Sequence, residues 1–375
     1  MPKRGGVDKW LYFTSLVLVV TGMAMVFSAS AIVAQEKHHS AFTFVLTQAI
    51  WAAAGLVAML VLMHIDVSYY NSPHFIYYAL SVTTLLLVLA FLLPGSHHTH
   101  RWIRFGDFLT LQPSEIAKPV LVFFLAWFLH SRLDHQFVRT LLPAALVPFV
   151  FIVLVVAEPD LGTAMVLAGT TAMTLVLAGM EWKILLAAFC VALPPLAWLL
   201  LVPWRFARLL AFLHPNCDAR DAANAASYHV CQSLIAVGNG GLTGLGYMEG
   251  MQKLFYLPEA ATDFIFANIA EELGFIGAMS VATLFVIFGA RGLRTAFCCA
   301  DSFARFVAFG ITTTILLQAF FNISVVLSLV PTKGIPLPLI SHGGTSLFCT
   351  LASTGVLLNI SRQAAHKRQV LGAGA

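Results

Sequence analysis

Four carboxylates interrupt one otherwise apolar stretch of the chain. Glu259 and Asp263 stand at its start, and Glu271 and Glu272 lie further inside it. A charged side chain costs roughly 2.5–3.5 kcal/mol at the centre of a membrane helix on insertion scales. Acids therefore persist in such segments mainly where a site uses them or a partner neutralises them. We expect Glu271 and Glu272 to pair with a basic or hydroxyl group inside a helix bundle.

Asp263 allows two interpretations. Helical spacing places positions 263, 267, 270 and 274 on one face, and small residues follow the carboxylate along it. Small residues permit close helix packing, so Asp263 is expected to face protein in a half-dry cavity. Burial would raise its pKa toward the working range of a general base. The alternative is a local role in starting the helix, with Thr262 as the N-cap.

A second charged pair enters the apolar run that begins near residue 114. Glu115 and Lys118 are three positions apart, so they share a helix face, and Pro113 suits the first turn of that helix. Each charge needs a partner in a low dielectric, either the other or Asp263. Two roles stay open: a structural ion pair, or a site where Lys118 holds an anionic head group.

Arginines could add positive charge to the same site. Arg101 and Arg104 lie in one connection, and Arg205 and Arg208 share a face if 204–212 forms a helix along the membrane. Several such donors would hold a diphosphate, although each alone could equally snorkel to the interface. No metal-ligand spacing, P-loop or dinucleotide fingerprint is present, so no metal site is predicted from the residues.

The elements that position these residues are membrane helices. Of the 375 residues, 59% are hydrophobic and 10% charged, where soluble proteins carry about 25% charged residues. Apolar runs of about 20 residues, enough to span a bilayer, recur along the chain. The sequence predicts an all-α polytopic membrane protein with about ten transmembrane helices. The runs cover about 10–33, 42–63, 75–93, 114–130, 141–157, 162–180, 182–202, 264–289, 306–330 and 345–361.

Lys and Arg set the orientation. They concentrate in short connections that lie inside if the N-terminus is inside, so both termini are predicted to be cytoplasmic. The large connection 203–262, between helices 7 and 8, then lies outside, with 94–113 and 331–344. The chain, residues 1–375, is read as one transmembrane domain with its site on the extracytoplasmic side. The net charge of +4 reflects the loop asymmetry and does not indicate nucleic acid.

The motifs resemble a known family over nearly the whole chain. The matching segments are RWIRFGDFLTLQPSEIAK, EPDLGTA, RFARLLAFLHP, YHVCQSLIAVGNGGLTGLG, QKLFYLPEAATDFIFANIAEELG and NISVVLSLVPTKGIPLPLISHGGTSL. Together they resemble the SEDS family (shape, elongation, division and sporulation). The segment QKLFYLPEA is more similar to the FtsW branch than to the RodA branch.

The resemblance implies a peptidoglycan glycosyltransferase of the inner membrane, acting in cell division. Such proteins polymerise lipid II, a disaccharide-pentapeptide on undecaprenyl diphosphate, beside a class B penicillin-binding protein and other divisome membrane proteins. It implies that Asp263 is the catalytic carboxylate and that Glu115 and Lys118 belong to the functional core. Glu259 and Ser341, within matching segments, join the four arginines as candidate substrate-binding residues.

Two departures from the family pattern bear on the site. The family usually has His before Thr-Asp-Phe, where this chain has Ala261, so His229 or His342 could replace that side chain. The family also usually has an aromatic residue at position 342 and an uncharged one where Lys333 stands.

The chemistry fits one inverting displacement of undecaprenyl diphosphate. A general base, Asp263, would take the proton of the acceptor hydroxyl, and cations would stabilise the leaving diphosphate. A divalent cation, Mg²⁺ or Mn²⁺, could assist. Two other classes of function stay open: a lipid II flippase and a non-catalytic divisome scaffold. Clustering of the motifs on one side disfavours the flippase, because alternating access needs polar groups near the midplane.

The cysteines are a separate question. Cys217 and Cys231 both fall in the outer connection, where a disulfide closing about 15 residues would contribute roughly 3 kcal/mol. Cys231 lies in an apolar helical pattern that also suits a buried thiol. We predict that both are free thiols.

Overall fold

The computed structural model describes residues 6–38, 40–93, 101–105, 109–131, 142–213, 225–254 and 256–372. Helices coincide with every predicted apolar run. They are α1 (Lys9–His38), α2 (Thr43–Leu62), α3 (Pro73–Leu92), α4 (Pro113–Ser131), α5 (Leu142–Ala157), α6 (Leu161–Leu177), α7 (Trp182–Leu200), α10 (Ile265–Cys298), α11 (Ser302–Val326) and α12 (Gly344–Gly372). The predicted all-α polytopic fold is confirmed.

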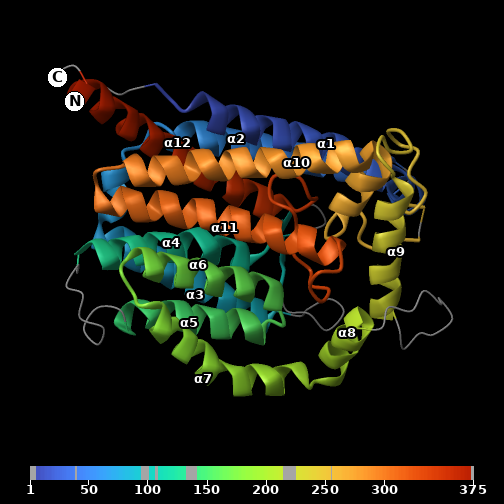
Figure 1. Cartoon of the computed structure of the whole chain (residues 1–375), viewed down its shortest axis with the longest axis horizontal. Coiled ribbons are helices and arrows are strands. Elements are labelled where there is room, and N and C mark those ends of the chain that lie inside the picture. Colours follow the sequence, from blue (N-terminus) through green and yellow to red (C-terminus); the bar gives the residue numbers. More distant parts are fainter. Residues whose placement is uncertain are drawn as a thin grey trace.

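The helices form a bundle whose ends differ. Six of them, α1, α2, α3, α10, α11 and α12, are long and apolar enough to cross a membrane, and α5, α6 and α7 contain shorter apolar helices. Most of the long helices run side by side, with the start of α1 and the end of α12 at one end of the bundle (Figure 1). The opposite end carries α8 (Pro203–Leu213), α9 (Ala225–Asn239) and the connections that hold the motifs. The chain is a multi-pass membrane protein.

Two small elements complete the part of the chain that the structure describes. A 3-10 turn, η1 (Val67–Asn71), joins α2 to α3. Strands β1 (Ile103–Phe105) and β2 (Leu109–Leu111) pair antiparallel, with Arg104 opposite Thr110. This hairpin leads directly into α4, so it sets where the Gln-Pro-Ser-Glu segment starts.

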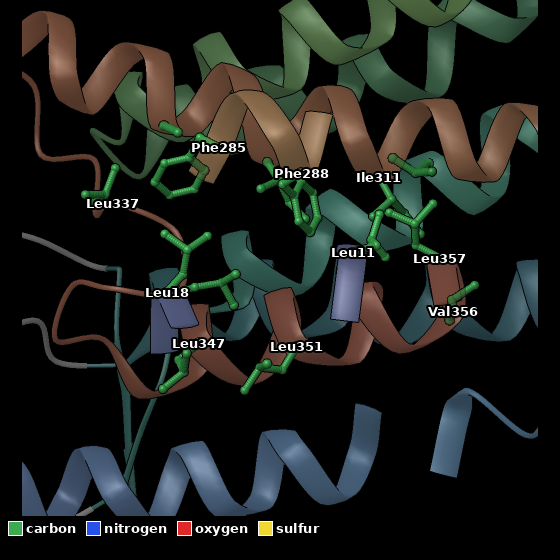
Figure 2. Packing of buried hydrophobic residues seen from close by; sticks show 14 of the residues in the cluster. Leu11, Leu18, Phe285, Phe288, Ile311, Leu337, Leu347, Leu351, Val356 and Leu357 are labelled. Atoms are coloured by element: carbon green, nitrogen blue, oxygen red, sulfur yellow. The ribbon is translucent and has the colours of Figure 1, made fainter. Parts of the chain in front are cut away.

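The core lies between α1, α10, α11 and α12. Figure 2 shows Leu11 and Leu18 of α1 with Phe288 of α10 and Leu351 of α12, all nearly or fully buried. Leu337, from the connection between α11 and α12, belongs to the same cluster. That connection is therefore anchored in the bundle by an apolar side chain.

Helix α10 is broken at Gly274. This residue has φ 67 and ψ −168, a conformation that suits glycine and interrupts the helical backbone. A glycine-rich turn fills the break: Leu245 N–H donates to the Glu271 carbonyl at 3.0 Å, and Phe275 N–H donates to the Gly241 carbonyl at 2.9 Å. The turn that follows α9 thus supplies the hydrogen bonds that the broken helix lacks.

The predicted span 264–289 lies within α10 apart from its first residue, and the break places Glu271 and Glu272 in the short segment before Gly274. Glu272 was expected to pair with a basic or hydroxyl group, and it does: Lys253 Nζ lies at 2.6 Å and Ser28 Oγ donates at 2.6 Å. The same expectation for Glu271 was wrong. Backbone amides donate to its carboxylate, from Met251 at 3.0 Å and from Gln252 at 3.2 Å.

The described part of the large connection 203–262 contains two helices. The predicted helix over 204–212 is confirmed as α8, an amphipathic helix with Phe206, Leu210 and Leu213 exposed. Cys231, on α9, is disulfide-bonded, so the prediction that it is a free thiol was wrong. An apolar helical pattern could not decide this, because a thiol and a disulfide both suit a buried position. Cys217 lies outside the described residues.

Candidate active site around Asp263

The segment before α10 forms a tight turn around Glu259. Glu259 has φ 56, and its carbonyl accepts hydrogen bonds from the backbone N–H groups of Thr262 and Phe264, both at 3.2 Å. The hydroxyl of Thr262 donates to the Glu259 carboxylate at 2.8 Å. The N-cap of α10 is Phe264, with no side-chain cap, so the alternative in which Thr262 caps the helix is not what the structure shows. Asp263 gives no such cap either, which weakens the purely local interpretation.

The connection between α11 and α12 lies against this turn. His342 N–H donates to the Ala261 carbonyl at 2.9 Å, and Ser341 Oγ donates to the Thr262 carbonyl at 2.6 Å. The Ser341 hydroxyl also accepts from Leu337 N–H at 2.7 Å. A predicted substrate-binding residue thus has its hydroxyl engaged by the backbone, where it joins the two loops.

Gly334 brings the same connection over the carboxylate. A Cβ atom added at this glycine would lie 2.9 Å from Asp263 Oδ2. Any side chain there would press on the carboxylate oxygen, so this close approach requires glycine.

Side chains of helix α11 hydrogen-bond both the turn that carries Asp263 and the connection between α11 and α12. Asn322 donates from its side-chain amide to the carbonyls of Asp263, at 2.8 Å, and Ile335, at 2.7 Å. One turn away, Gln318 donates to the Pro336 carbonyl at 2.9 Å. Two amides at i and i+4 on one buried face therefore hold the connection between α11 and α12, and Asn322 also holds the backbone that carries the carboxylate.

The carboxylate of Asp263 has a strongly perturbed environment. Its pKa is raised to about 7, first by burial and then by the negative charges of Glu259 and Asp160. Arg101 and Arg208 oppose that shift. A carboxylate with a pKa near the ambient pH can accept a proton from a substrate and still return it, which is what a general base requires. The structure thus brings together four predicted residues: Asp263, Glu259, Arg101 and Arg208.

Arg101 is held in place by the turn between α5 and α6. Its guanidinium donates to the carbonyl of Glu158 at 3.1 Å and to that of Pro159. Asp160 in the same turn caps α6, accepting from Thr163 N–H at 3.1 Å, and it also accepts from the Gln112 amide at 3.0 Å. The motifs EPDLGTA and Gln-Pro-Ser-Glu therefore meet at this position.

The other two predicted arginines are only partly described. Arg104 lies in β1 and Arg205 in α8, but their side chains are outside the part that the structure describes.

Glu158 is a buried acid that the sequence analysis gave no role. Its side chain is fully buried, and neither carboxylate oxygen has a hydrogen-bond partner among the described residues. Burial and the charge of Asp160 raise its pKa to about 8, against the lowering effect of Arg101. Glu158 is therefore mostly protonated at neutral pH, and it adds little negative charge next to Arg101.

Glu115 and Lys118 form the ion pair that their spacing predicts. Lys118 Nζ lies 2.6 Å from Glu115 Oε2, and both side chains are buried. Lys118 also donates to Gln318 Oε1 at 2.6 Å. A cavity of ≈ 20 Å³ beside the pair is lined by polar groups of α11 and α12, including Thr314 and Ser353, and has room for about one water.

The ion pair is joined to the Asp263 region through one side chain. Gln318 accepts from Lys118 and donates to the Pro336 carbonyl, in the connection whose Ser341 contacts Thr262. Glu115 and Lys118 were each expected to pair either with the other or with Asp263, and in the structure they pair with each other. The direct alternative, a bond to Asp263, is not formed.

Two histidines lie beside the site. His342 N–H contacts the Ala261 carbonyl, while its ring hydrogen-bonds the backbone of Phe44 and leaves Nε2 buried without a partner among the described residues. The His229 ring stacks on Phe264 with centroids 6.0 Å apart. Burial lowers the pKa of both imidazoles and so favours their neutral form.

Residues missed by the sequence analysis are mainly polar groups in apolar helices. Gln318 and Asn322 stand four apart within α11, and that pattern alone marks a buried polar face. Within the described residues, no three side chains of His, Cys, Asp or Glu converge as a metal site requires. A Mg²⁺ ion held mainly by substrate phosphates needs only one or two protein carboxylates, so the divalent cation considered from the sequence stays a proposal.

Fold and site together define a multi-pass membrane protein with a polar, charged site at one end of its bundle. The family model for FtsW, RodA and SpoVE, described as cell cycle protein, matches residues 9–366. The chain belongs to this family.

Relatives match along nearly their whole length. A protein of Geobacter sp. (strain M18), named probable peptidoglycan glycosyltransferase FtsW, is 40% identical over 371 residues, with 96% of this chain and 98% of that protein covered. Stage V sporulation protein E of Bacillus subtilis (strain 168) is 37% identical over 367 residues, with 96% and 98% covered. Several relatives carry the name FtsW, which is the branch that the sequence predicts.

Solved structures share the fold. A chain from a structure described as structural coordination of polymerization and crosslinking by a peptidoglycan synthase complex has a TM-score of 0.76 and 25% identity, covering 96% of this chain and 98% of that chain. The rod shape determining protein RodA of Thermus thermophilus has a TM-score of 0.69 at 24% identity, covering 96% and 97%. The predicted architecture is thus confirmed by structural likeness.

Proposed function

We propose that this protein is a peptidoglycan glycosyltransferase that polymerises lipid II, with Asp263 as the general base. The observation that carries the proposal is the Asp263 carboxylate itself. It stands at the motif-bearing end of the bundle, its pKa is raised to about 7, and two arginines act on it. The names of relatives supply the class of reaction, peptidoglycan glycosyl transfer.

The reaction is one inverting displacement. The acceptor sugar hydroxyl attacks the anomeric carbon of the donor while the bond from that carbon to the lipid diphosphate breaks. Asp263 takes the hydroxyl proton, and the electron pair of the broken bond leaves on the diphosphate. A base with a pKa of about 7 is partly deprotonated at neutral pH, so it can act without a further activation step.

Positive charge for the leaving group comes from arginines in this proposal. Arg101, fixed by two carbonyls, and Arg208, on the amphipathic helix α8, are the described candidates. Arg104 and Arg205 remain proposed donors of the same kind. Protonation of Glu158 removes an anion from the side of Arg101, which leaves that guanidinium free to attract a phosphate. A Mg²⁺ or Mn²⁺ ion stays a proposal with no ligand assigned, and no step is derived through it.

The Glu115–Lys118 pair has a positioning role in this scheme. The Lys118 ammonium is buried and bound by Glu115 and Gln318. Gln318 also donates to the Pro336 carbonyl, so the ion pair orders the connection between α11 and α12 through this side chain. Direct contact of Lys118 with the head group would need this network to open. We therefore place Lys118 in the functional core as a group that acts through Gln318.

Orientation and partners follow from the same proposal. The motif end faces the extracytoplasmic side and both termini are cytoplasmic, as the distribution of Lys and Arg predicts. A class B penicillin-binding protein is the proposed partner, because a structural neighbour comes from a synthase complex that couples polymerization and crosslinking. Other divisome membrane proteins are proposed as further contacts.

One experiment separates the proposed activity from its alternatives. Purified protein in liposomes receives fluorescent lipid II, and products are resolved by size while accessibility of the label reports translocation. Polymer that disappears in Asp263→Asn supports the transferase. Translocation without polymer would indicate the flippase, and neither activity, with the penicillin-binding partner present, would indicate the scaffold.

A further inference from the structure

Two cavities meet around the start of α1, at the end of the bundle opposite Asp263. The first, ≈ 450 Å³, has polar walls from three helices. Its lining is Gly6, Val7, Asp8, Lys9 and Trp10, then Arg291, Arg294, Thr295 and Cys298 of α10, and Ser361 of α12. The second, ≈ 700 Å³, lies between α1 and α2 and is lined by Val7, Lys9, Trp10, Tyr12, Phe13, Leu60 and Met63. Val7, Lys9 and Trp10 line both, so the two cavities are adjacent.

The polar cavity has an excess of positive charge. Its one carboxylate, Asp8, is already used: Arg291 donates to it at 2.8 Å and 2.5 Å, and it caps α1 by accepting from Trp10 N–H at 3.1 Å. Lys9 and Arg294 are exposed, and the described residues give neither an ion-pair partner. Two cations therefore face this cavity with no carboxylate of the described residues paired to them.

The second cavity is apolar apart from its shared rim. Trp10 and Phe13 are 59% and 58% exposed, and Leu60 on α2 is 44% exposed. Trp and Tyr favour the level of the head groups at a membrane surface, where one end of the ring is wet and the other apolar. A soluble anion would gain nothing from this apolar wall, whereas an acyl chain attached to the anion would cover it.

We propose that the paired cavities bind one anionic phospholipid from the leaflet on the side of the termini. Lys9 and Arg294 contact its phosphate, and an acyl chain lies along Trp10, Phe13 and Leu60. Charge complementarity selects an anionic head group, because each nearby Lys or Arg adds to its attraction to the protein. The site links α1, α2, α10 and α12, so an occupied site would tie the N-terminal segment to the bundle.

Native mass spectrometry of the full chain in neutral detergent tests this proposal. The protein is titrated with phosphatidylglycerol or with phosphatidylcholine of identical acyl chains. We expect one phosphatidylglycerol to be retained in preference to phosphatidylcholine. Lys9→Gln combined with Arg294→Gln should weaken that binding about tenfold or more. Both side chains are exposed, so their replacement should leave the fold intact, which the charge-state distribution reports.

Lys183→Gln is the matched control. Lys183 is an exposed lysine at the start of α7, at the same end of the bundle, and its loss removes one charge away from the cavities. Its phosphatidylglycerol affinity should equal that of the wild type. Equal retention of both lipids, or an equal loss in the control, would overturn the site. Displacement of the lipid by millimolar glycerol 3-phosphate would show a soluble-anion site and overturn the phospholipid assignment.

Discussion

The side-chain amide of Asn322 holds the backbone carbonyl of Asp263 at 2.8 Å. One turn along the same helix, Gln318 accepts from Lys118 and donates to the Pro336 carbonyl. A single face of α11 thus connects the buried ion pair of α4 to the loop that carries the carboxylate. The position of Asp263 is set by this helix, and a change in α11 should act on catalysis without touching substrate.

Asn322→Leu tests that connection. Leucine has a similar size but cannot donate, so two buried carbonyls lose their partner. The cost is about 1–3 kcal/mol per unsatisfied buried group. We expect lower thermal stability and a loss of lipid II polymerisation that exceeds the loss of folded protein, measured on the folded fraction after size-exclusion chromatography.

Asn359→Leu provides the comparison. Asn359 of α12 also donates to two carbonyls, those of Met63 and Ile65, both at 2.7 Å, but at the opposite end of the bundle. It should destabilise the protein to a similar extent while polymerisation per folded molecule stays near the wild-type value. An equal loss of activity in both variants would mean that stability alone explains the effect.

Asp263→Asn should abolish polymerisation while leaving folding and membrane insertion intact. The amide keeps the shape of the side chain but cannot accept the hydroxyl proton, and removing a general base typically costs at least about 10²-fold. Polymer yield from fluorescent lipid II is the measurement. A near-normal yield would move the base to another carboxylate, with Glu259 the next candidate.

The pH dependence of kcat/KM should report the Asp263 environment. The base must be deprotonated, so the rate should rise with pH through the pKa of about 7. Glu259 raises that pKa by its negative charge, so Glu259→Gln should move the acid limb to lower pH. The position of the limb is read, rather than the maximal rate, because Glu259 is also a candidate substrate contact.

Arg208→Gln should shift the pKa of Asp263 in the opposite direction to Glu259→Gln. Its positive charge lowers the pKa of Asp263, so its loss should move the acid limb to higher pH. Burial is the largest cause of the shift and is unchanged in both variants, which keeps each displacement small. Movement of both limbs in the same direction would show that the titrating group is not Asp263.

The sequence predicts more of the fold than of the site. Every apolar run became a helix because length and hydropathy dictate a membrane span locally. The break at Gly274 was missed, since its hydrogen bonds come from residues near 241 and 245 that no periodicity connects to it. In the site, Glu115 and Lys118 paired as their spacing requires.

The spacing of residue types in the sequence could not predict the contacts of Arg101 and Asn322. Both bind backbone carbonyls on other elements, and carbonyls carry no residue-type signal. Sequence reasoning therefore finds which side chains are costly to bury, whereas the structure shows which distant backbone groups they satisfy.

Glu115 and Lys118 should be energetically coupled. Removing one partner leaves the other charge buried and unpaired, which typically costs about 3–5 kcal/mol. The double alanine variant should lose less stability than the two single variants added together. Unfolding of all four proteins in one detergent completes the cycle, and strictly additive losses would show that the 2.6 Å contact carries no coupling.

His342 can be tested with two substitutions that each keep one ring function. Its ring bonds the Phe44 backbone, which leaves Nε2 as a buried acceptor without a described partner, beside Ala261. Glutamine places a polar atom near the Nε2 position, and asparagine places one near Nδ1. We expect Nε2 to accept from a donor of the substrate other than the hydroxyl that Asp263 deprotonates, replacing the histidine that the family usually has at position 261. His342→Gln should then retain several-fold more polymerisation than His342→Asn. The reverse order would show that His342 only anchors its loop to Phe44, and His229, stacked on Phe264, would become the candidate.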